Sequence, residues 1–412
     1  MSRVFVTGVG VVAPTAIGRS EFHAALCAGR SGVAEVTHFD TAGMDRTHAC
    51  EVKGFRSRDH LTAAEDRRSG RCSAMAIAAA RMAVEDAGME SSLLCTDRCS
   101  VILGTTMGEA NLLGELEKVW IHEGEEAVAP TRLPRYGTTL LPIHVARALG
   151  ARGMVLTLPA ACAAGNYAIG FASDQIREGR ADVVITGGSE VIERLQYAGF
   201  LRLGAMAPDH CRPFDANRRG LIIGEGAGIL VLESEAHLVR RGGRPLAEVG
   251  GYGLACDAHH ITRPHPEGEG SERAMLGAIA SSGLTASEVD FINAHGTGTQ
   301  TNDPIESRVL ARLFGEGAVP VSSIKSMIGH CMGAASAIEA VSCVLTLDHD
   351  LMPPTIHHEH TDPACPVDVV ANRPRSQRVN VVLNNSLAFG GYDAVVTFAR
   401  VGTLPNVEER GH

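Results

Sequence analysis

Residues 156–172, LTLPAACAAGNYAIGFA, change from a strand pattern to a helix pattern within a few positions. The β run ends at Pro159, and the stretch after Cys162 is rich in Ala, Ile and Phe, as in a helix that packs inside a protein. Small side chains occupy the turn and permit a sharp bend: Ala160, Ala161, Ala163, Ala164 and Gly165. We therefore expect a strand, a tight turn and a helix, with the Cys162 thiol beside the helix N-terminus, which favours a thiolate.

Short apolar runs alternate with Ala-rich stretches along most of the chain. The apolar runs are residues 4–10, 100–106, 181–188, 227–233 and 289–296, and an Ala-rich stretch occupies residues 73–88. Runs without polar alternation are typical of strands buried on both faces of a sheet. The chain is therefore predicted to have an α/β fold.

A faint internal repeat is also present. Residues 83–108 and 275–299 each pass from a helix that stops at Gly, through a short connection and a strand, to a Gly/Thr-rich turn. Residues 154–165 and 380–391 each pass from a strand to a tight turn. If the chain consists of two halves of similar plan, we expect the active site where their strand ends meet. The alternative is that two ordinary βα units resemble each other by chance.

Composition and charge exclude several classes of protein. The net charge of -10 argues against nucleic acid as the main partner, because binding phosphate backbones needs a dominant basic surface. Eleven Cys residues are dispersed without a CxxC pair, which gives no indication of a zinc site. The most apolar long stretch, residues 332–347, is interrupted by Glu339 and is shorter than the roughly 20 residues of a membrane helix. The N-terminal apolar run is interpreted as a strand, not a signal peptide, so we expect a cytoplasmic location.

Four residues at predicted strand ends or turns are candidates for chemistry. Cys162 lies in the turn described above, His295 follows the run at residues 289–294, and Lys325 and His330 precede a predicted helix. Taken alone, the thiol is explained as a buried structural cysteine and each imidazole as a hydrogen-bonded loop residue. Together, a thiol, two imidazoles and an ammonium match the demands of cleaving a carboxylate from a thioester and stabilising the resulting enolate.

The set resembles the elongating β-ketoacyl-acyl-carrier-protein synthases of the thiolase-like superfamily. Six motifs occur in the family's order over almost the whole chain: ACAAG (161–165), VVITGGSE (183–190), CRPFDANRRGLIIGEGAGILVLE (211–233), NAHGTGTQTNDPIE (293–306), SSIKSMIGHCMGAASAIEA (322–340) and NNSLAFGGYDA (384–394). The resemblance implies a thiolase-like α/β fold of duplicated α-β-α-β-α layered halves. Residues 1–245 would form the half with the nucleophile, and residues 246–412 the half with both histidines.

The resemblance also implies a role for each catalytic candidate. Cys162 would accept the acyl chain from the carrier protein's phosphopantetheine thiol, with the backbone N–H groups of Cys162 and Phe389 as its oxyanion hole. Phe389 would also be the gating aromatic that admits an acyl chain before the malonyl unit binds. His295 and His330 would hold the malonyl thioester carbonyl and stabilise the enolate after CO2 loss.

Supporting residues are implied in the same way. Lys325, with Glu339, would assist the histidines electrostatically and through hydrogen bonds. Asp303 and Glu306 would belong to the supporting polar network. The residues implied to contact the pantetheine arm are Thr297 and Thr299.

Substrate and carrier contacts are less defined. The candidates for the acyl pocket are Met107, Ile192, Phe200 and Leu387. Here Leu387-Ala388 replaces the family's usual Phe-Gly, and Tyr392-Asp393 replaces its Thr-Asn, which puts a housekeeping fatty-acid role in doubt. Candidates for docking an acidic carrier protein are Arg67, Arg68 and Arg71, with Arg202 as a further one. A solvated helix face is the alternative for these arginines.

The sequence therefore predicts an acyltransferase that catalyses decarboxylative Claisen condensation of an acyl chain with malonyl-acyl-carrier protein. We expect no metal and no cofactor of its own, since the phosphopantetheine arrives on the carrier protein. The expected assembly is a homodimer, or a heterodimer with a chain-length-factor-like paralogue. Two alternatives are open: the active subunit of a specialised type II polyketide or polyene pathway with a Cys-less partner, and a non-catalytic scaffold subunit.

Overall fold

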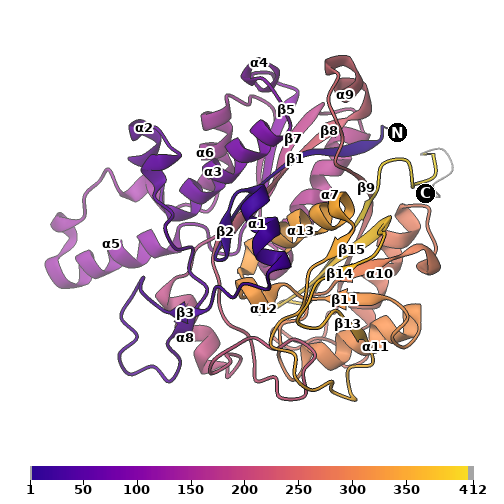
Figure 1. Ribbon diagram of the computed structural model, residues 1–412. Coiled ribbons are helices and arrows are strands. Elements are labelled where there is room, and N and C mark those ends of the chain that lie inside the picture. The colour runs from indigo at the N-terminus through magenta and orange to yellow at the C-terminus, as the bar shows by residue number, and fades with distance from the viewer. Residues whose placement is uncertain (1, 407–412) are drawn as a thin grey trace.

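The computed structural model describes residues 2–406, in which a mixed 12-stranded sheet runs through the molecule (Figure 1). The strands of the first half are β1 (Val4–Ala13), β2 (Ala16–Ile17), β5 (Cys99–Gly104), β6 (Val155–Leu158), β7 (Val183–Glu190) and β8 (Gly226–Ser234). The strands of the second half are β9 (Ala247–Cys256), β10 (Phe291–Asn293), β11 (Pro320–Ser322), β13 (Asp368–Val369), β15 (Val381–Ala388) and β16 (Tyr392–Ala399). Two small sheets pair β3 (Ala34–Glu35) with β4 (His48–Ala49) and β12 (Leu351–Met352) with β14 (Arg375–Ser376).

Each half contributes five main strands in the same order and with the same relative directions. In the first half the order is β1-β8-β7-β5-β6, and in the second it is β9-β16-β15-β10-β11. In both, the first two pairings are antiparallel and the last two are parallel. The halves join where Phe5 and Val6 of β1 pair with Glu248 and Ala247 of β9. The duplicated α/β fold predicted from the sequence is confirmed.

The predicted correspondence between the halves is only half right. Strands β5 and β10, which belong to residues 83–108 and 275–299, occupy equivalent positions. The pairing of residues 154–165 with 380–391 is wrong, because the counterpart of β6 is β11, and the counterpart of β15 is β7. A strand followed by a tight turn is too common a pattern to identify which strands correspond.

Helices form three layers around the two half-sheets, giving the α-β-α-β-α arrangement. Helices α3 and α6 cover the first half-sheet, α10 and α11 lie on the second, and α7 and α13 lie between them. The helices are α1 (Arg19–Cys27), α2 (Ala63–Asp66), α3 (Arg71–Asp86), α4 (Ser91–Leu94), α5 (Ala110–Glu123), α6 (Leu140–Leu149), α7 (Ala164–Arg177), α8 (Arg194–Arg202), α9 (Glu235–Arg241), α10 (Glu269–Ser281), α11 (Asn302–Phe314), α12 (Lys325–Ile328) and α13 (Ala335–His349).

The two central helices are enclosed by protein. Helix α13 is buried continuously from Ala335 to Leu347, so the most apolar stretch of the sequence is a core helix. No helix within residues 2–406 combines the length and apolar character needed to cross a membrane. Gly165 in α7 lets the helices approach, since a Cβ there would lie 2.6 Å from the backbone nitrogen of Ala337 in α13.

Two predictions concern the boundary between the halves and the C-terminal tail. The boundary between residues 245 and 246 lies between α9 and β9, and its status as a domain boundary stays a prediction. The polar composition of residues 402–412 predicts a frayed tail. This is wrong for residues 402–406, because Leu404 packs into the core of the second half. Residues 407–412 lie outside the described part of the chain.

The close approach of α7 and α13 predicts the cost of one added methyl group. Gly165→Ala should lower the free energy of unfolding by about 1–3 kcal/mol, because the methyl group overlaps the α13 backbone. The matched control is Gly199→Ala in α8, where a Cβ meets no heavy atom within 4 Å and should stabilise the helix by about 0.5–1 kcal/mol. Thermal and urea unfolding measure both; equal stability of the two variants would contradict the packing argument.

Candidate active site

Cys162 lies in a strained turn between β6 and α7. The turn contains a 3-10 segment, Ala161–Ala163, and Ala161 has a positive φ of 47°, which residues with a side chain seldom adopt. The same bend recurs before α13, where Met332 has a φ of 44° at the start of the 3-10 segment Met332–Ala334. Because α7 and α13 both begin at such bends, their N-terminal ends and positive dipoles converge near Cys162.

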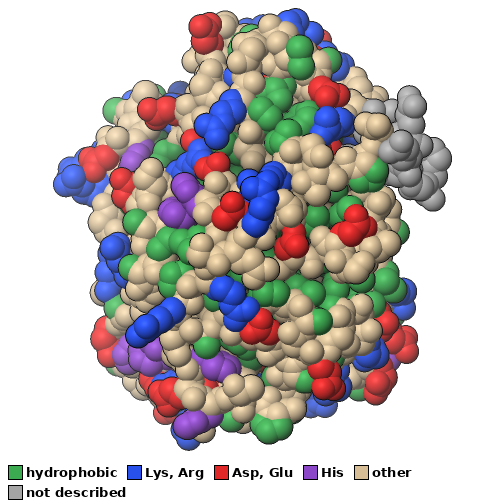
Figure 2. All heavy atoms as spheres, turned by 45° about the vertical axis from the view of Figure 1, so that its right-hand side comes forward, with side chains coloured by type: hydrophobic (Ala, Val, Ile, Leu, Met, Phe, Trp, Pro, Cys, Tyr) green, Lys and Arg blue, Asp and Glu red, His purple; other side chains and the backbone are tan. Residues whose placement is uncertain are grey.

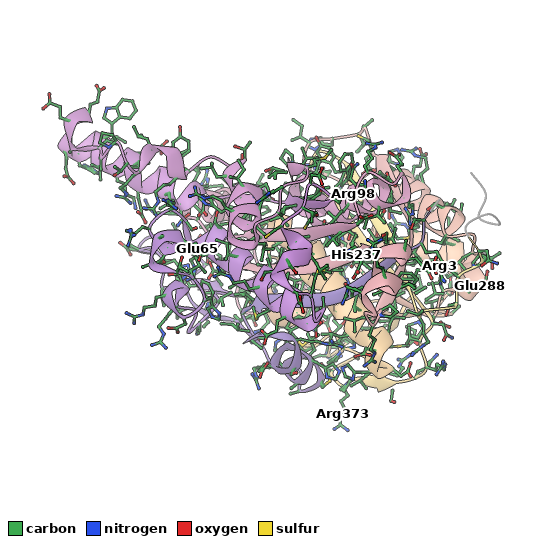
Figure 3. All side chains as sticks on the ribbon, turned by 90° about the horizontal axis from the view of Figure 1, so that it is seen from above. Arg3, Glu65, Arg98, His237, Glu288 and Arg373 are labelled. Atoms are coloured by element: carbon green, nitrogen blue, oxygen red, sulfur yellow. The ribbon has the colours of Figure 1, made fainter. Side chains whose placement is uncertain are left out.

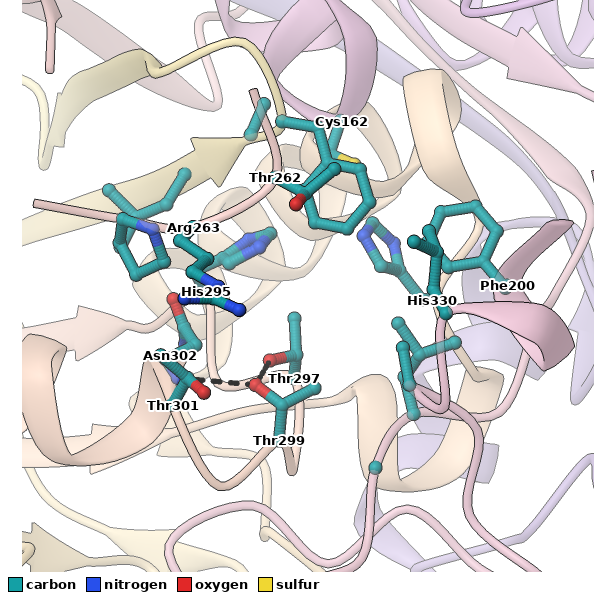
Figure 4. A pocket seen from close by; sticks show the side chains of 18 of the residues that line it. Cys162, Phe200, Thr262, Arg263, His295, Thr297, Thr299, Thr301, Asn302 and His330 are labelled. Atoms are coloured by element: carbon teal, nitrogen blue, oxygen red, sulfur yellow. Dashed lines mark hydrogen bonds between the residues drawn. The ribbon is translucent and has the colours of Figure 1, made fainter. Parts of the chain in front are cut away.

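Side chains from both halves of the chain converge on one cavity of about 430 Å³ (Figure 4). Cys162 contributes its sulfur from the first half, and His295 and His330 contribute their rings from the second. The centroids of these rings lie 5.5 Å apart, and their planes meet at 83°. Of the other residues singled out in the sequence, the cavity wall includes Thr297, Thr299, Phe200, Leu387 and Phe389.

Both histidines are buried and uncharged at neutral pH. Burial lowers the pKa of each imidazole well below its usual value, and the positive charge of Lys325 lowers it further. The backbone N–H of Met332 donates to Nδ1 of His330 at 3.2 Å. In the neutral ring the proton therefore resides on Nε2, which makes His330 a hydrogen-bond donor through that atom.

The charge that acts on these rings belongs to a fully buried ion pair. Nζ of Lys325 lies 2.5 Å from Oε1 of Glu339, and both side chains are 0% exposed. Lys325 begins α12 and Glu339 lies in the first half of α13, so the pair ties the turn before His330 to the central helix. Burial raises the pKa of Glu339, and the charge of Lys325 opposes that rise. A cation is thereby kept in the interior beside the cavity.

The free Cys162 is a thiol, contrary to the thiolate expected from its place at a helix end. Burial raises the pKa of Cys162 to about 12, although Lys325 and the backbone N–H groups of Phe389 and Cys162 lower it. Acyl transfer to this sulfur therefore requires removal of its proton. The same two N–H groups face the sulfur, which is the placement that oxyanion-hole donors need.

Two buried carboxylates of α11 hold the loop that carries His295. Glu306 accepts the backbone N–H groups of His295 at 2.7 Å and of Gly296 at 2.8 Å. Asp303 accepts the N–H of Gly298 at 3.2 Å, and burial raises its pKa to about 6. These contacts orient the loop so that the hydroxyls of Thr297 and Thr299, which bond each other at 2.9 Å, face the cavity (Figure 4).

The candidates for the acyl pocket lie in different places. Phe200 of α8 stacks on Phe389 with ring centroids 5.5 Å apart, and Leu387 lines the same cavity. Ile192 belongs to the hydrophobic cluster around Cys162 and lines a second cavity of about 640 Å³. Met107 lines neither of these cavities, and its backbone N–H donates to Glu190. Its role in binding an acyl chain stays a prediction.

The docking candidates differ in how far their side chains are committed to the fold. Arg71 forms an ion pair with buried Glu225 at 2.6 Å and donates to the carbonyl of Val52 at 2.9 Å, so its guanidinium is committed to the fold. Whether Arg71 also contacts the carrier protein stays a prediction. Arg67 and Arg68, just beyond α2, and Arg202 at the end of α8 are exposed, and their docking role stays a prediction.

Sequence reasoning missed three charged residues near the cavity. Arg219 and Arg263 line the cavity from exposed positions. Arg219 belongs to the motif at residues 211–233 but was not singled out, and Arg263 lies outside all six motifs. Glu190, at the end of β7, is fully buried and accepts N–H groups of Thr106 and Gly333, while burial raises its pKa to about 7. A carboxylate at the end of the run VVITGGSE is the sequence feature by which Glu190 could have been identified.

Within residues 2–406 no cluster of His, Cys, Asp and Glu is arranged to hold a metal ion.

Comparison with known proteins agrees with this geometry. Residues 1–237 match the family described as beta-ketoacyl synthase, N-terminal domain, and residues 246–359 match its C-terminal domain. The curated 3-oxoacyl-[acyl-carrier-protein] synthase 2 of a Synechocystis strain is 37% identical over 407 residues, which cover 97% of this chain and 98% of that protein.

Two solved structures extend the likeness to three dimensions. A chain of the ishigamide ketosynthase/chain length factor has a TM-score of 0.94 and 42% identity, covering 97% of this chain and all of that one. A chain from the structure of a type II PKS acyl-carrier protein in complex with its ketosynthase bound to the hexaketide has a TM-score of 0.88 and 31% identity, covering 97% and 99%. The chain described here belongs to the β-ketoacyl synthase family.

Proposed function

We propose that this protein elongates an acyl chain by decarboxylative condensation with malonyl-acyl-carrier protein. The observation that carries the proposal is the single cavity lined by Cys162, His295 and His330, with the buried Lys325 ammonium beside it. A nucleophilic thiol and two neutral donors are the groups that acyl transfer and enolate formation require. The protein needs no cofactor of its own, because the phosphopantetheine arrives on the carrier protein.

The first step transfers the acyl chain to Cys162. The sulfur attacks the thioester carbonyl as its proton passes to a neighbouring imidazole, and the backbone N–H groups of Cys162 and Phe389 stabilise the oxyanion. The bond between the acyl carbon and the pantetheine sulfur then breaks, and the pantetheine thiol leaves with that proton. The acyl chain stays on Cys162 as a thioester.

The second step joins two carbons. The malonyl carboxylate leaves as CO2, and its bonding electrons form an enolate whose oxygen accepts Nε2–H of His330. The enolate carbon attacks the Cys162 thioester, a carbon–carbon bond forms, and the carbon–sulfur bond breaks. The released sulfur of Cys162 takes up a proton, and a 3-oxoacyl product remains on the carrier protein. Contact with the pantetheine arm is assigned to Thr297 and Thr299, which line the cavity.

A partner chain is part of the proposal. Helix α5 projects from the body of the molecule (Figures 1 and 3) and exposes Trp120 by 60% and Ile121 by 76%. Leu195 of α8 is 72% exposed beside the second cavity, and β6 forms an edge of the main sheet. Exposed apolar side chains and a free strand edge are features that a second subunit covers.

The identity of that subunit distinguishes the two enzymatic roles. A second copy of this chain fits a fatty-acid-type synthase, and a Cys-less paralogue fits a type II polyketide or polyene pathway. The likeness to a ketosynthase/chain length factor at 42% identity favours the second role. The presence of Cys162 and both histidines in the cavity disfavours a non-catalytic scaffold. The cytoplasm stays the predicted location.

Carrier docking is assigned to exposed cations near the cavity. Arg263 and Arg219 line the cavity itself, and Arg202 lies at the end of α8, whose Phe200 is part of its wall. On the face shown in Figure 2, acidic and basic side chains are interspersed, so that face offers no single-sign field for an acidic partner. Arg67 and Arg68 supply further positive charge on the first half.

Replacing the nucleophile tests the order of the steps. Cys162→Gln should abolish condensation and retain some decarboxylation of malonyl-carrier protein, because the histidines and Lys325 remain in place. Mass spectrometry of the wild type with an acyl-carrier protein should show one acyl adduct, on Cys162. Cys95→Ser, at an exposed cysteine, is the control and should keep full activity. Unchanged condensation by the Cys162 variant would remove this residue from the mechanism.

Removing the buried cation separates stability from electrostatics. Lys325→Met should destabilise the fold by about 3–5 kcal/mol, because Glu339 is left buried without its partner. The double variant Lys325→Met, Glu339→Leu should recover most of that stability but not the decarboxylation rate. Urea unfolding and a CO2-release assay measure the two effects. Recovery of both by the double variant would show that the charge has no role in the reaction.

The subunit contact is tested at α5. Ile121→Glu should convert a dimer, or a complex with the paralogue, into separate chains, because a charge replaces apolar contact area. Val239→Glu in α9 changes an equally exposed residue away from α5 and should leave the assembly intact. Sedimentation velocity measures both. An unaltered assembly in the Ile121 variant would place the subunit contact elsewhere.

A further inference from the structure

Two carboxylates face each other beside the catalytic cavity, and the mechanism above uses neither. Asp393 is the second residue of β16 and is 2% exposed. Asp257 directly follows β9, the strand paired with β16. Both residues belong to the wall of the cavity that contains Cys162. A pair of acids at this place needs a physical explanation, because two negative charges close together repel each other.

The facing oxygens lack a donor. Oδ2 of Asp393 and Oδ1 of Asp257 are both buried, and neither has a hydrogen-bond partner among the described residues. Both lie beside Gly270, where a Cβ would be 2.1 Å from the first and 2.5 Å from the second. The other oxygen of Asp257 accepts the N–H of His265 at 2.8 Å. One proton held between the two facing oxygens would satisfy both.

The charged and titratable groups around the pair leave that proton in place at neutral pH. Arg273 of α10 is the cation that acts on Asp393, and the other titratable neighbours are Tyr167 of α7, Cys256 of β9 and Tyr392 of β16. Burial and then the charge of Asp257 raise the pKa of Asp393 to about 8, which Arg273 opposes. Below that pH, Asp393 is a carboxylic acid that donates to Asp257.

The pair lies at the junction of two segments that border the cavity. The N–H of Asp257 donates to the carbonyl of Gly391 at 2.9 Å, and the N–H of Gly390 donates to the carbonyl of Ile261 at 2.7 Å. Residues 257–265 are thus bonded to the turn at residues 389–391 between β15 and β16. That turn carries Phe389, whose ring stacks on Phe200 and whose N–H faces the Cys162 sulfur.

We propose that Asp257 and Asp393 share one proton and act as a positioning pair that holds residues 257–265 against the turn carrying Phe389. Loss of the shared proton leaves two adjacent negative charges, which push the two segments apart and displace Phe389 from the Cys162 sulfur. Acylation of Cys162 then depends on a proton that is not transferred in the reaction. This consequence rests on the proposed function, whereas the shared proton itself does not.

The decisive variant is Asp393→Asn, because its Nδ2–H donates to Asp257 at every pH. Acylation of Cys162 by hexanoyl-pantetheine is followed by mass spectrometry from pH 6 to pH 10. The ratio of wild-type to variant rate should fall at least threefold above about pH 8, since ionisation of Cys162 affects both proteins equally. Asp97→Asn, at an exposed acid, is the control and should follow the wild-type profile.

A second measurement is independent of activity. The folded wild type retains a proton on Asp393 that the unfolded chain releases, so its stability should decline relative to Asp393→Asn as pH rises from about 4 to about 8. Above about pH 8 the difference should be constant. Thermal unfolding of the two proteins across this range measures the difference, with Asp97→Asn again as the control.

The outcomes separate the two proposals. A stability difference without acylation at any pH would reject the proposed function and keep the shared proton. Acylation with parallel pH profiles and no change in the stability difference would reject the pair. A stability difference with parallel acylation profiles would reject its positioning of Phe389.

Discussion

The buried ion pair between Lys325 and Glu339 is the constraint on which the site depends. A charge in the interior must be paired, and here the pairing fixes the position of α12 against the central helix α13. Burial lowers the pKa of His295 and His330, and the same ammonium lowers it further. Both rings are therefore neutral and can donate hydrogen bonds. One interaction thus ties α12 to α13 and, together with burial, keeps the two histidines neutral.

Duplication explains why the site lies between the halves. Each half turns from a parallel strand region into a central helix through a bend with positive φ, at Ala161 in one half and Met332 in the other. Because α7 and α13 pack against each other, the two bends meet, and neither half contains a complete set of reactive groups. The first supplies a sulfur and the second supplies two imidazoles and a cation.

Local sequence patterns predicted the parts of the structure that depend on neighbours in the chain. The strand, turn and helix at residues 156–172 and the catalytic motifs follow from side-chain size and order. Contacts between distant residues were not predictable: Glu225, which binds Arg71, is 154 positions away, and the burial that makes Cys162 a thiol involves both halves. Leu404 was misjudged for the same reason, because polar neighbours conceal one core residue.

Phe389 combines two properties in one residue, since its backbone N–H faces the Cys162 sulfur and its ring stacks on Phe200 in the cavity wall. A shift of this backbone segment therefore moves the ring and the amide together. A backbone shift that opens the cavity wall between Phe389 and Phe200 would also take an N–H group away from the Cys162 sulfur. The shape of the cavity and its electrostatic environment are thus coupled through one peptide unit.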